Sequence, residues 1–196
     1  MKDLILDFET LGTGAERDDF IVLDCAFTTF DLLGKSDFQD VLSNVTYTKF
    51  SVENQQDKYG WRAEKDTLEW WKSQPKEAQS ILKESDDDIS IEEFVKIFIK
   101  SVNSMDKLER IWCRGTDFDL PILKRFFRAV GKNVNDTVPY WAACDIRTYI
   151  KTKTNFEFID NGFIPEGLEN CGFIKHKCDH DISMDIMRLQ YLNREL

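Results

Sequence analysis

The chain has 196 residues, of which 42% are hydrophobic and only 4 are proline, and its formal charge at pH 7 is −10. This composition excludes a disordered or collagen-like protein, and the length fits one domain over residues 1–196 with a full core. The negative charge argues against a broad basic surface for duplex nucleic acid, although clustered acids become locally positive once they bind metal ions.

The sequence predicts neither a membrane span nor an exported protein. No apolar run approaches the roughly 20 residues that a membrane helix needs, and the first residues do not form a secretory signal. The five cysteines are odd in number and show no C-x-x-C spacing. We therefore expect reduced thiols in the cytoplasm rather than a disulfide framework, and no membrane as a partner.

The N-terminal third predicts a meander of strands. Segments 4–10, 21–30 and about 41–48 are rich in β-branched and aromatic residues, and Gly34 with polar neighbours separates the last two. We therefore expect three consecutive strands joined by turns.

Helical patterns dominate the rest of the chain. We expect helices at 67–73, 75–83, about 119–130, where Gly131 ends the helix, and about 181–192. Ser90 begins a capping-box pattern that opens a further helix, and residues 110–114 form a short strand after it. A strand followed by a helix suggests a parallel βα unit, which with the meander predicts a mixed α/β sheet. Residues 152–174 show little pattern apart from a turn at Asn161-Gly162.

The first predicted strand carries two carboxylates, in the stretch LILDFET. Asp7 and Glu9 fall on one face of a strand, where each raises the cost of ionising the other. A hard divalent cation such as Mg²⁺ takes oxygen ligands and would resolve this conflict. The alternative is an edge strand that shows a polar face to water, so the pair gains weight only if the chain supplies more acids.

Two further aspartates stand where helices are expected to begin. Asp119 follows a strand, at the carboxyl edge where α/β sheets usually place their sites, and Asp181 follows His176 by five residues. Either aspartate could instead cap its helix, and His176 could be a surface residue.

A zinc site is a competing interpretation of the C-terminal segment. Four potential ligands fall within ten residues, namely Cys171, His176, Cys178 and His180. Ligands at every second residue do not match the paired loops of zinc sites, so the spacing disfavours zinc.

Taken together, the motifs resemble a known family. The stretches that carry the resemblance are DFETLGTG at 7–14, DTLEWWKSQPKEA at 66–78, WCRGTDFDLPIL at 112–123, YWAACDIRT at 140–148 and HKCDHDISMDI at 176–186. They resemble the DEDDh branch of the DnaQ-like 3′–5′ exonucleases and run across nearly the whole chain. Their combination in this order is far more specific than any one motif.

The resemblance implies an RNase H-like fold, with a five-stranded mixed sheet whose first three strands are antiparallel and which helices flank. It implies an exodeoxyribonuclease that releases nucleoside 5′-monophosphates from DNA 3′ ends with two divalent cations, Mg²⁺ or Mn²⁺. The implied metal ligands are Asp7, Glu9, Asp119 and Asp181. His176 would be the general base, and Thr10 and Leu11 would contact the terminal nucleotide.

Neighbouring residues offer alternatives for these assignments. They are Asp117, Asp179, His180 and Asp185. Asp119 is preferred because a phenylalanine precedes it. His176 is preferred because it alone among the histidines has the five-residue offset to Asp181.

Two other functions stay open. An exoribonuclease or oligoribonuclease-like enzyme of the same superfamily would use the same acids, because the choice between RNA and DNA rests on contacts at the 2′ position. A catalytically silent nucleic-acid-binding module on the same fold is the second, and the complete set of acids with a histidine argues against it.

Aromatic and basic residues near the motifs add two expectations. Trp70 and Trp71 are adjacent on a predicted helix, so one should enter the core and one could line the cleft and stack on a base. The alternative is that both simply pack, because large aromatic residues dominate cores. The basic residues that could contact backbone phosphates are Arg114, Arg147, Lys151 and Lys153, although most surface basic residues are merely solvated.

Overall fold

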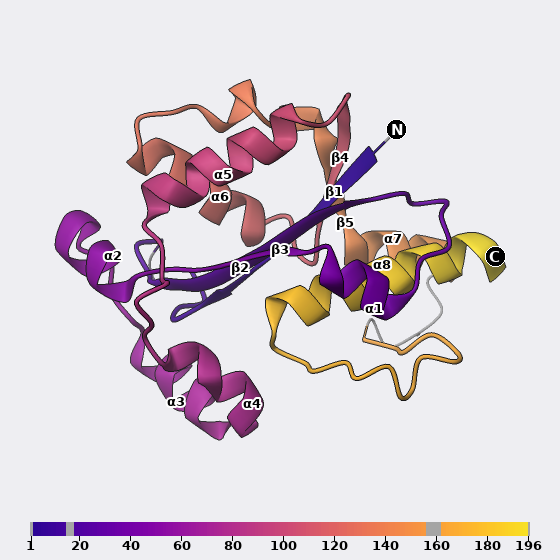
Figure 1. The fold of residues 1–196 in the computed structure, drawn as a ribbon, viewed down its shortest axis with the longest axis horizontal. Coiled ribbons are helices and arrows are strands. Elements are labelled where there is room, and N and C mark those ends of the chain that lie inside the picture. The colour runs from indigo at the N-terminus through magenta and orange to yellow at the C-terminus, as the bar shows by residue number, and fades with distance from the viewer. Residues whose placement is uncertain (1, 15–17, 156–161, 196) are drawn as a thin grey trace.

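A sheet of five strands in the order β3-β2-β1-β4-β5 runs through a computed structural model of the protein, which describes residues 2–14, 18–155 and 162–195 (Figure 1). The strands are β1 (Lys2–Thr10), β2 (Val22–Phe30), β3 (Thr46–Lys49), β4 (Leu108–Cys113) and β5 (Ala143–Asp145). The first three pair antiparallel, whereas β4 runs parallel to β1 and β5 parallel to β4. The expected mixed sheet is confirmed and is consistent with an RNase H-like fold.

Helices cover both faces of this sheet (Figure 1). One face carries α5 (Ile91–Asn103) and α6 (Asp119–Ala129), and the other carries α8 (Cys178–Glu195) with α1 (Phe38–Ser43) and α7 (Ile146–Lys153). Alternate residues of β1 serve the two layers, because Leu6 and Phe8 join the core under α5 and α6 whereas Ile5 joins the core under α8. The central strand is therefore buried on both faces.

Phenylalanine rings tie the end of β1 to the helices of the first layer. The ring centroid of Phe8 lies 6.0 Å from that of Phe94 in α5 and 5.6 Å from that of Phe126 in α6, both edge to face. Such pairs contribute about 0.5–1.5 kcal/mol each beyond the burial of their surface. The residue between Asp7 and Glu9 is thus firmly held.

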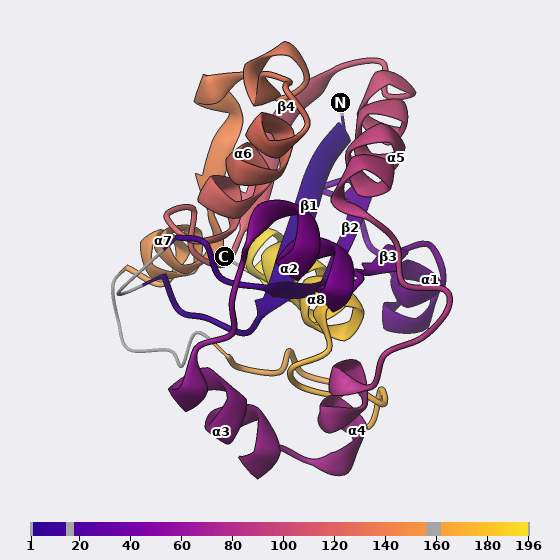
Figure 2. The ribbon, with the colours of Figure 1, turned by 90° about the vertical axis from the view of Figure 1, so that its left-hand side faces the viewer.

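Smaller helices lie beside the two layers. They are α2 (Val52–Tyr59), α3 (Lys65–Ser73), α4 (Lys76–Gln79) and the 3₁₀ turns η1 (Ser80–Leu82), η2 (Val134–Asp136) and η3 (Tyr140–Ala142). Figure 2 shows α3 and α4 apart from the sheet, close to the segment that leads into α8. The expected helix at 67–73 is confirmed as α3, and the one expected at 75–83 divides into α4 and η1. No helix in the described ranges is long and apolar enough to cross a bilayer.

The strand expected at about 41–48 is wrong in its first half. Residues Phe38–Ser43 form α1, and only Thr46–Lys49 form a strand. The reason is a local cap, because the side chain of Asp37 accepts hydrogen bonds from the backbone of Gln39 and Asp40. Phe38 is buried and anchors this short helix in the core under α8.

Three further elements were not expected from residue patterns, and each is short. α2 is capped by Ser51, and its Gln55 is buried. The Gln55 Nε2 donates to the backbone carbonyl of Val22, and the Gln55 Oε1 accepts from the backbone N–H of Val22. β5 has three residues, and Asp145 at its end caps α7. Elements of this length depend on caps and tertiary contacts rather than on a long periodic pattern.

The longer helices follow the sequence closely. α5 begins after Ser90, whose side chain accepts a hydrogen bond from the backbone of Glu93. α6 ends at Ala129, and Gly131 adopts φ +70° just beyond it. α8 begins at Cys178, three residues earlier than the expected start at 181. The turn expected at Asn161-Gly162 includes Asn161, which lies outside the described residues.

Candidate active site

A cavity of about 560 Å³ opens at the carboxyl ends of β1 and β4. Its lining comes from β1, from the segment that joins β4 to α6, and from the starts of α6, α7 and α8. The segment that precedes α8 closes another side. The parallel strands thus end where open α/β sheets usually bind their ligands.

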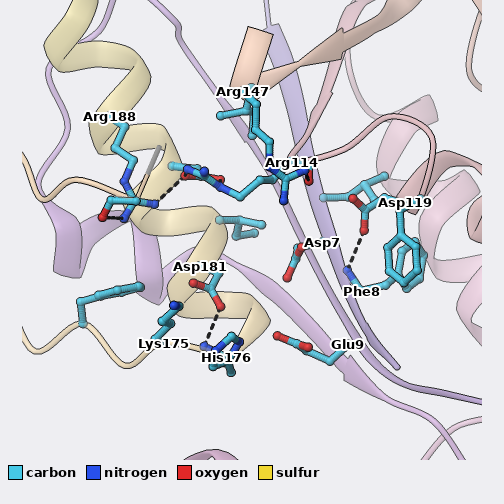
Figure 3. Close-up of a pocket in the computed structure, with 17 residues that line it drawn as sticks. Asp7, Phe8, Glu9, Arg114, Asp119, Arg147, Lys175, His176, Asp181 and Arg188 are labelled. Atoms are coloured by element: carbon cyan, nitrogen blue, oxygen red, sulfur yellow. Dashed lines mark hydrogen bonds and ion pairs between the residues drawn. The ribbon is translucent and has the colours of Figure 1, made fainter. Parts of the chain in front are cut away.

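The structure brings the five principal predicted site residues into this one cavity (Figure 3). They are Asp7, Glu9, Asp119, His176 and Asp181. They come from three separate segments of the chain, at residues 7–9, 119 and 176–181, which meet only in the fold. The strand alternation explains Asp7 and Glu9, which share the face opposite to Phe8.

Asp119 is the first residue of α6 and is 2% exposed. Its Oδ1 accepts a hydrogen bond from the backbone N–H of Phe8, with 3.2 Å between the heavy atoms. The N-cap of α6 is Phe118, so the alternative that Asp119 serves only as a cap is wrong. Instead its carboxylate is held against β1, directly between the positions of Asp7 and Glu9.

Asp181 lies in the first turn of α8, whose backbone there already bonds to Lys177. Its Oδ2 accepts a hydrogen bond from the backbone N–H of His176 at 2.9 Å. His176 has φ +63°, a left-handed conformation that costs free energy for a residue with a side chain. The hydrogen bond to Asp181 compensates for this cost and holds His176 beside the carboxylates.

Crowding and burial disfavour the charged forms of these acids. Burial, followed by Asp119 and Glu9, raises the pKa of Asp7 well above its ordinary value. Burial raises the pKa of Glu9 in the same way, and the next cause is Asp24, its partner on β2. Burial also raises the pKa of Asp119 and of Asp181 to about 7 each. A divalent cation would relieve this repulsion, so the donor set suits a hard metal ion.

One trio in the described part of the chain places its ligand atoms within 4.8 Å of one another, namely Glu9, His176 and Asp181. The four side chains of the zinc alternative do not form such a group there. Cys178 is fully buried in the core under α8, and His180 Nδ1 accepts a hydrogen bond from the backbone of Ile174. The zinc interpretation is therefore not supported.

Of the two adjacent tryptophans, one enters the core as expected, whereas the other contacts His176 without lining the cavity. Trp71 is fully buried, and its indole N–H donates to the backbone carbonyl of Thr10 at 2.8 Å. Trp70 is 41% exposed, and its ring meets the His176 ring edge to face with 4.9 Å between centroids.

Burial and the charge of Lys175 lower the pKa of His176, so the neutral form of His176 dominates at neutral pH.

Thr10 and Leu11 do not line the cavity. Both are buried, the Thr10 hydroxyl donates to the carbonyl of Gly12 at 2.6 Å, and the Leu11 backbone bonds to Ile21. They lie directly after Glu9, at the end of β1, so their contact with a nucleotide stays a prediction.

Comparisons with known proteins agree with this geometry. Residues 2–171 match the family described as the 3′-5′ exoribonuclease Rv2179c-like domain. The chain is also 32% identical to the exodeoxyribonuclease of Enterobacteria phage T4 over 211 aligned residues, which cover 99% of this chain and 90% of that protein. The chain therefore belongs to the family of Rv2179c-like exonuclease domains. It is a DnaQ-like 3′–5′ exonuclease, close to exonuclease A of T-even bacteriophages.

Sequence reasoning missed part of the exonuclease cavity. Beside the acids, the lining contains the basic side chains Arg114, Arg147, Lys175 and Arg188. Arg114 and Arg147 were candidates for phosphate contacts, whereas Lys151 and Lys153 lie outside the lining. Asp185 also lines it, one helical turn after Asp181 on α8. Asp185 was named among the alternatives to the assigned residues, and this four-residue spacing was the available signal for its place in the lining. The sequence carried no comparable signal for Lys175 or Arg188.

Proposed function

We propose that residues 1–196 form a single exonuclease domain that removes nucleoside 5′-monophosphates from the 3′ ends of DNA. The observation that carries the proposal is the convergence of four carboxylates from β1, α6 and α8 in one cavity, with His176 beside them. Four buried carboxylates so close together repel one another, and their ionised forms are unfavourable unless cations occupy the site.

Two divalent cations, Mg²⁺ or Mn²⁺, fit this donor set, and the residues that would hold them are Asp7, Glu9, Asp119 and Asp181. Bound cations of this kind stabilise the charge on the attacking and leaving oxygens and lower the pKa of water. The protein contributes a rigid frame, since Asp119 is bonded to β1 and Asp181 to the segment before α8.

His176 is proposed as the general base. Its lowered pKa keeps a ring nitrogen available to take the proton from the attacking water. The Trp70 ring and the hydrogen bond from the backbone N–H of His176 to Asp181 fix the position of His176 at the cavity. Thr10 and Leu11, directly after Glu9, are proposed to contact the terminal nucleotide, which would lie on this side of the acids.

DNA is proposed as the substrate because the relative that aligns with nearly the whole chain is named an exodeoxyribonuclease. The family match is named for exoribonuclease activity and ends at residue 171, before His176 and Asp181. RNA is therefore the second candidate. The five cysteines are free thiols, in keeping with action in a reducing cytoplasm, that of the host cell if a phage encodes the protein.

The deciding experiment follows 5′-labelled DNA and RNA oligonucleotides of one sequence in Mg²⁺, in Mn²⁺ and in EDTA. We expect a ladder that shortens from the 3′ end only with metal, and faster on DNA. Asp7→Asn should lower the rate at least about 100-fold, since even outer partners of metal ligands cost 10–100-fold. Asp87→Asn, in an exposed turn, is the matched control.

Each other outcome selects a different function. Faster shortening of RNA would make the protein an exoribonuclease. Binding of oligonucleotides without shortening would favour the silent binding module. Shortening in EDTA, or full activity of Asp7→Asn, would refute the metal-dependent mechanism.

A further inference from the structure

The exonuclease cavity has two walls of opposite charge. The predicted metal ligands form one wall, and three arginines form the other, the basic wall of Arg114, Arg147 and Arg188 (Figure 3). Lys175 also lines the cavity, but it lies beside His176 and Asp181. Asp185 is the single acid among these arginines. The basic wall therefore keeps a surplus of positive charge in a chain whose net charge is −10.

Arg114 is held as a rigid part of this wall. Its Nε donates to Asp185 Oδ2 at 2.9 Å and its Nη2 donates to Asp185 Oδ1, a two-pronged contact that fixes the plane of the guanidinium. Arg188 donates to the same carboxylate at 2.7 Å and also to the backbone carbonyl of Phe163 at 2.6 Å. The side chain of Arg188 is only 5% exposed, whereas that of Arg114 is 22% exposed at the cavity. Arg188 thus supports Asp185, and Arg114 is presented to a ligand.

Arg147 and Lys175 add two exposed charges to the lining of the cavity, and Lys175 directly precedes His176 in the chain. Arg147 donates from Nη1 to the backbone carbonyl of Arg114, which places its guanidinium beside the first one. Gly115 makes room for this contact, because a Cβ there would lie 2.8 Å from Arg147 Nη1. Within the described residues no ion pair joins Arg147 or Lys175 to an acid. Their charges are available to an anion.

The chemistry of the substrate identifies which anion this is. The last nucleotide of a strand has a free 3′ hydroxyl and a single phosphodiester, the one that is cut. That scissile group belongs with the acids and their cations. Every other phosphate of the substrate lies on its 5′ side. The proposed contacts of Thr10 and Leu11 put the terminal nucleotide on the Glu9 side of the cavity, away from the arginines (Figure 3).

We infer that Arg114 and Arg147 form a binding site for the phosphodiester on the 5′ side of the scissile bond. The inference rests on the proposed function and names its substrate class, a strand with at least two linkages in preference to a dinucleotide. Planar guanidiniums are the usual protein partners of phosphate oxygens.

Two substrates separate this site from the reaction itself. One is a single-stranded DNA oligonucleotide. The other is the 4-nitrophenyl ester of thymidine 5′-monophosphate, in which water attacks the same kind of phosphorus and 4-nitrophenolate leaves, but which has no phosphate beyond the scissile one. Arg147→Ala should lower kcat/KM about 10-fold or more on the oligonucleotide, as expected for loss of a charged hydrogen bond. The loss on the ester should be less than about 2-fold.

The matched control is Arg194→Ala. Arg194 is exposed on α8 and lies 13 residues beyond Asp181, about 20 Å along the helix axis. Its removal takes away one positive charge far from the cavity. Rates on both substrates should stay within about 2-fold of the wild type, as expected for an isolated surface charge.

A binding measurement makes the test independent of turnover. In an Asp119→Asn background, fluorescence anisotropy compares an oligonucleotide with one that carries a neutral methylphosphonate at the linkage next to the scissile one. We expect the methylphosphonate oligonucleotide to bind the Asp119→Asn protein more weakly than the unmodified one. When Arg147→Ala is added, the two oligonucleotides should bind equally. We also expect the salt slope to fall by about 0.7 for each lost contact on a single strand.

The outcomes separate the inference from the proposed function. Equal losses on both substrates would mean that the basic wall acts on the scissile group, and losses on neither would mean that it binds no phosphate. Either result overturns the inference while leaving the exonuclease intact. A wild-type protein that hydrolyses neither substrate overturns the proposed function, and the binding data then decide the inference alone.

Discussion

Phe8 shows how one residue allows two acids to occupy a buried strand. Its ring enters the aromatic core between Phe94 and Phe126, so the residues on either side of it must face the cavity. Its backbone N–H meanwhile donates to Asp119. One residue thus positions three of the four predicted metal ligands, and the acids share a site because the core leaves them no other face.

His176→Ala tests the proposed base. The substitution should lower kcat by about 10²–10⁴-fold and leave KM within a few-fold, because the ring acts on the proton of the attacking water. Steady-state kinetics with the oligonucleotide measure both constants. His180→Gln is the control, since a glutamine oxygen can still accept the hydrogen bond from Ile174. A rise in KM with unchanged kcat would assign His176 to substrate binding instead.

The tryptophan pair separates stability from turnover. Trp71→Ala should lower the free energy of unfolding by about 3–5 kcal/mol, as for other large aromatic side chains lost from a core. Trp70→Ala removes a 41% exposed ring and should cost less than about 1 kcal/mol. It should nevertheless lower kcat several-fold, because the His176 ring loses its neighbour. Urea denaturation and kinetics on the same preparations check both statements, and equal effects of the two variants would contradict them.

At the residue scale, sequence motifs predicted which side chains meet but not how they are held. The acids at 7, 9, 119 and 181 come together because they lie in β1 or in the first turns of α6 and α8, elements that the sequence predicts. The left-handed backbone of His176 and its bond to Asp181 could not be predicted, because both depend on how residues 162–177 pack. Arg114 and Arg147 were named as candidates for phosphate contacts, but Lys175 and Arg188 were missed, since single lysines and arginines carry no pattern of their own.

At the element scale, length decided what could be predicted. α5 carries several turns of apolar periodicity and was expected to begin after Ser90, and α6 was expected nearly at its true bounds. α1 was read as part of a strand because Val41 and Leu42 resemble strand residues, whereas the Asp37 cap and the buried Phe38 determine its conformation. A cap counts for more in a six-residue helix than in one of thirteen.

α8 combines two functions at successive turns, because Asp181 faces the acids and Asp185 holds Arg114 and Arg188. Asp185→Ala should lower the free energy of unfolding by about 3–5 kcal/mol, since it leaves a buried arginine without its partner. Asp185→Asn should cost less and keep the shape of the wall. Urea denaturation measures the difference, with the exposed Asp40→Asn as control. Loss of less than about 1 kcal/mol in Asp185→Ala would show that the pair is not structural.

At the scale of the whole molecule, a hydrophobic core covers each face of the sheet, and the predicted metal ligands lie close together at the carboxyl ends of its central strands. The packing of α5, α6 and α8 fixes the acids near one another whether or not cations are bound, so the metal-free protein bears the cost of their repulsion. Stability and metal binding should therefore be linked, and both should depend on pH.

The direction of this dependence follows from the raised pKa values of about 7 for Asp119 and Asp181. In the unfolded chain these carboxyls ionise near pH 4, so between about pH 4 and 7 the folded state binds more protons than the unfolded state. Their contribution is full below pH 4 and is lost as the pH rises through 7. In EDTA, wild-type Tm should therefore fall between pH 5 and 8 relative to that of Asp119→Asn, in which one of these groups cannot ionise.

Mg²⁺ or Mn²⁺ should reverse this loss. A cation at 100 times its Kd stabilises the folded state by about 2.7 kcal/mol, and its effect should be larger at pH 8 than at pH 5 because protons compete for the same oxygens. Calorimetric scans from pH 5 to 8 in EDTA and in each metal measure both effects. A metal-free protein that gains stability from pH 5 to 8 relative to Asp119→Asn would contradict the raised pKa values of Asp119 and Asp181. A cation effect independent of pH would show that protons and cations do not compete for these carboxylates.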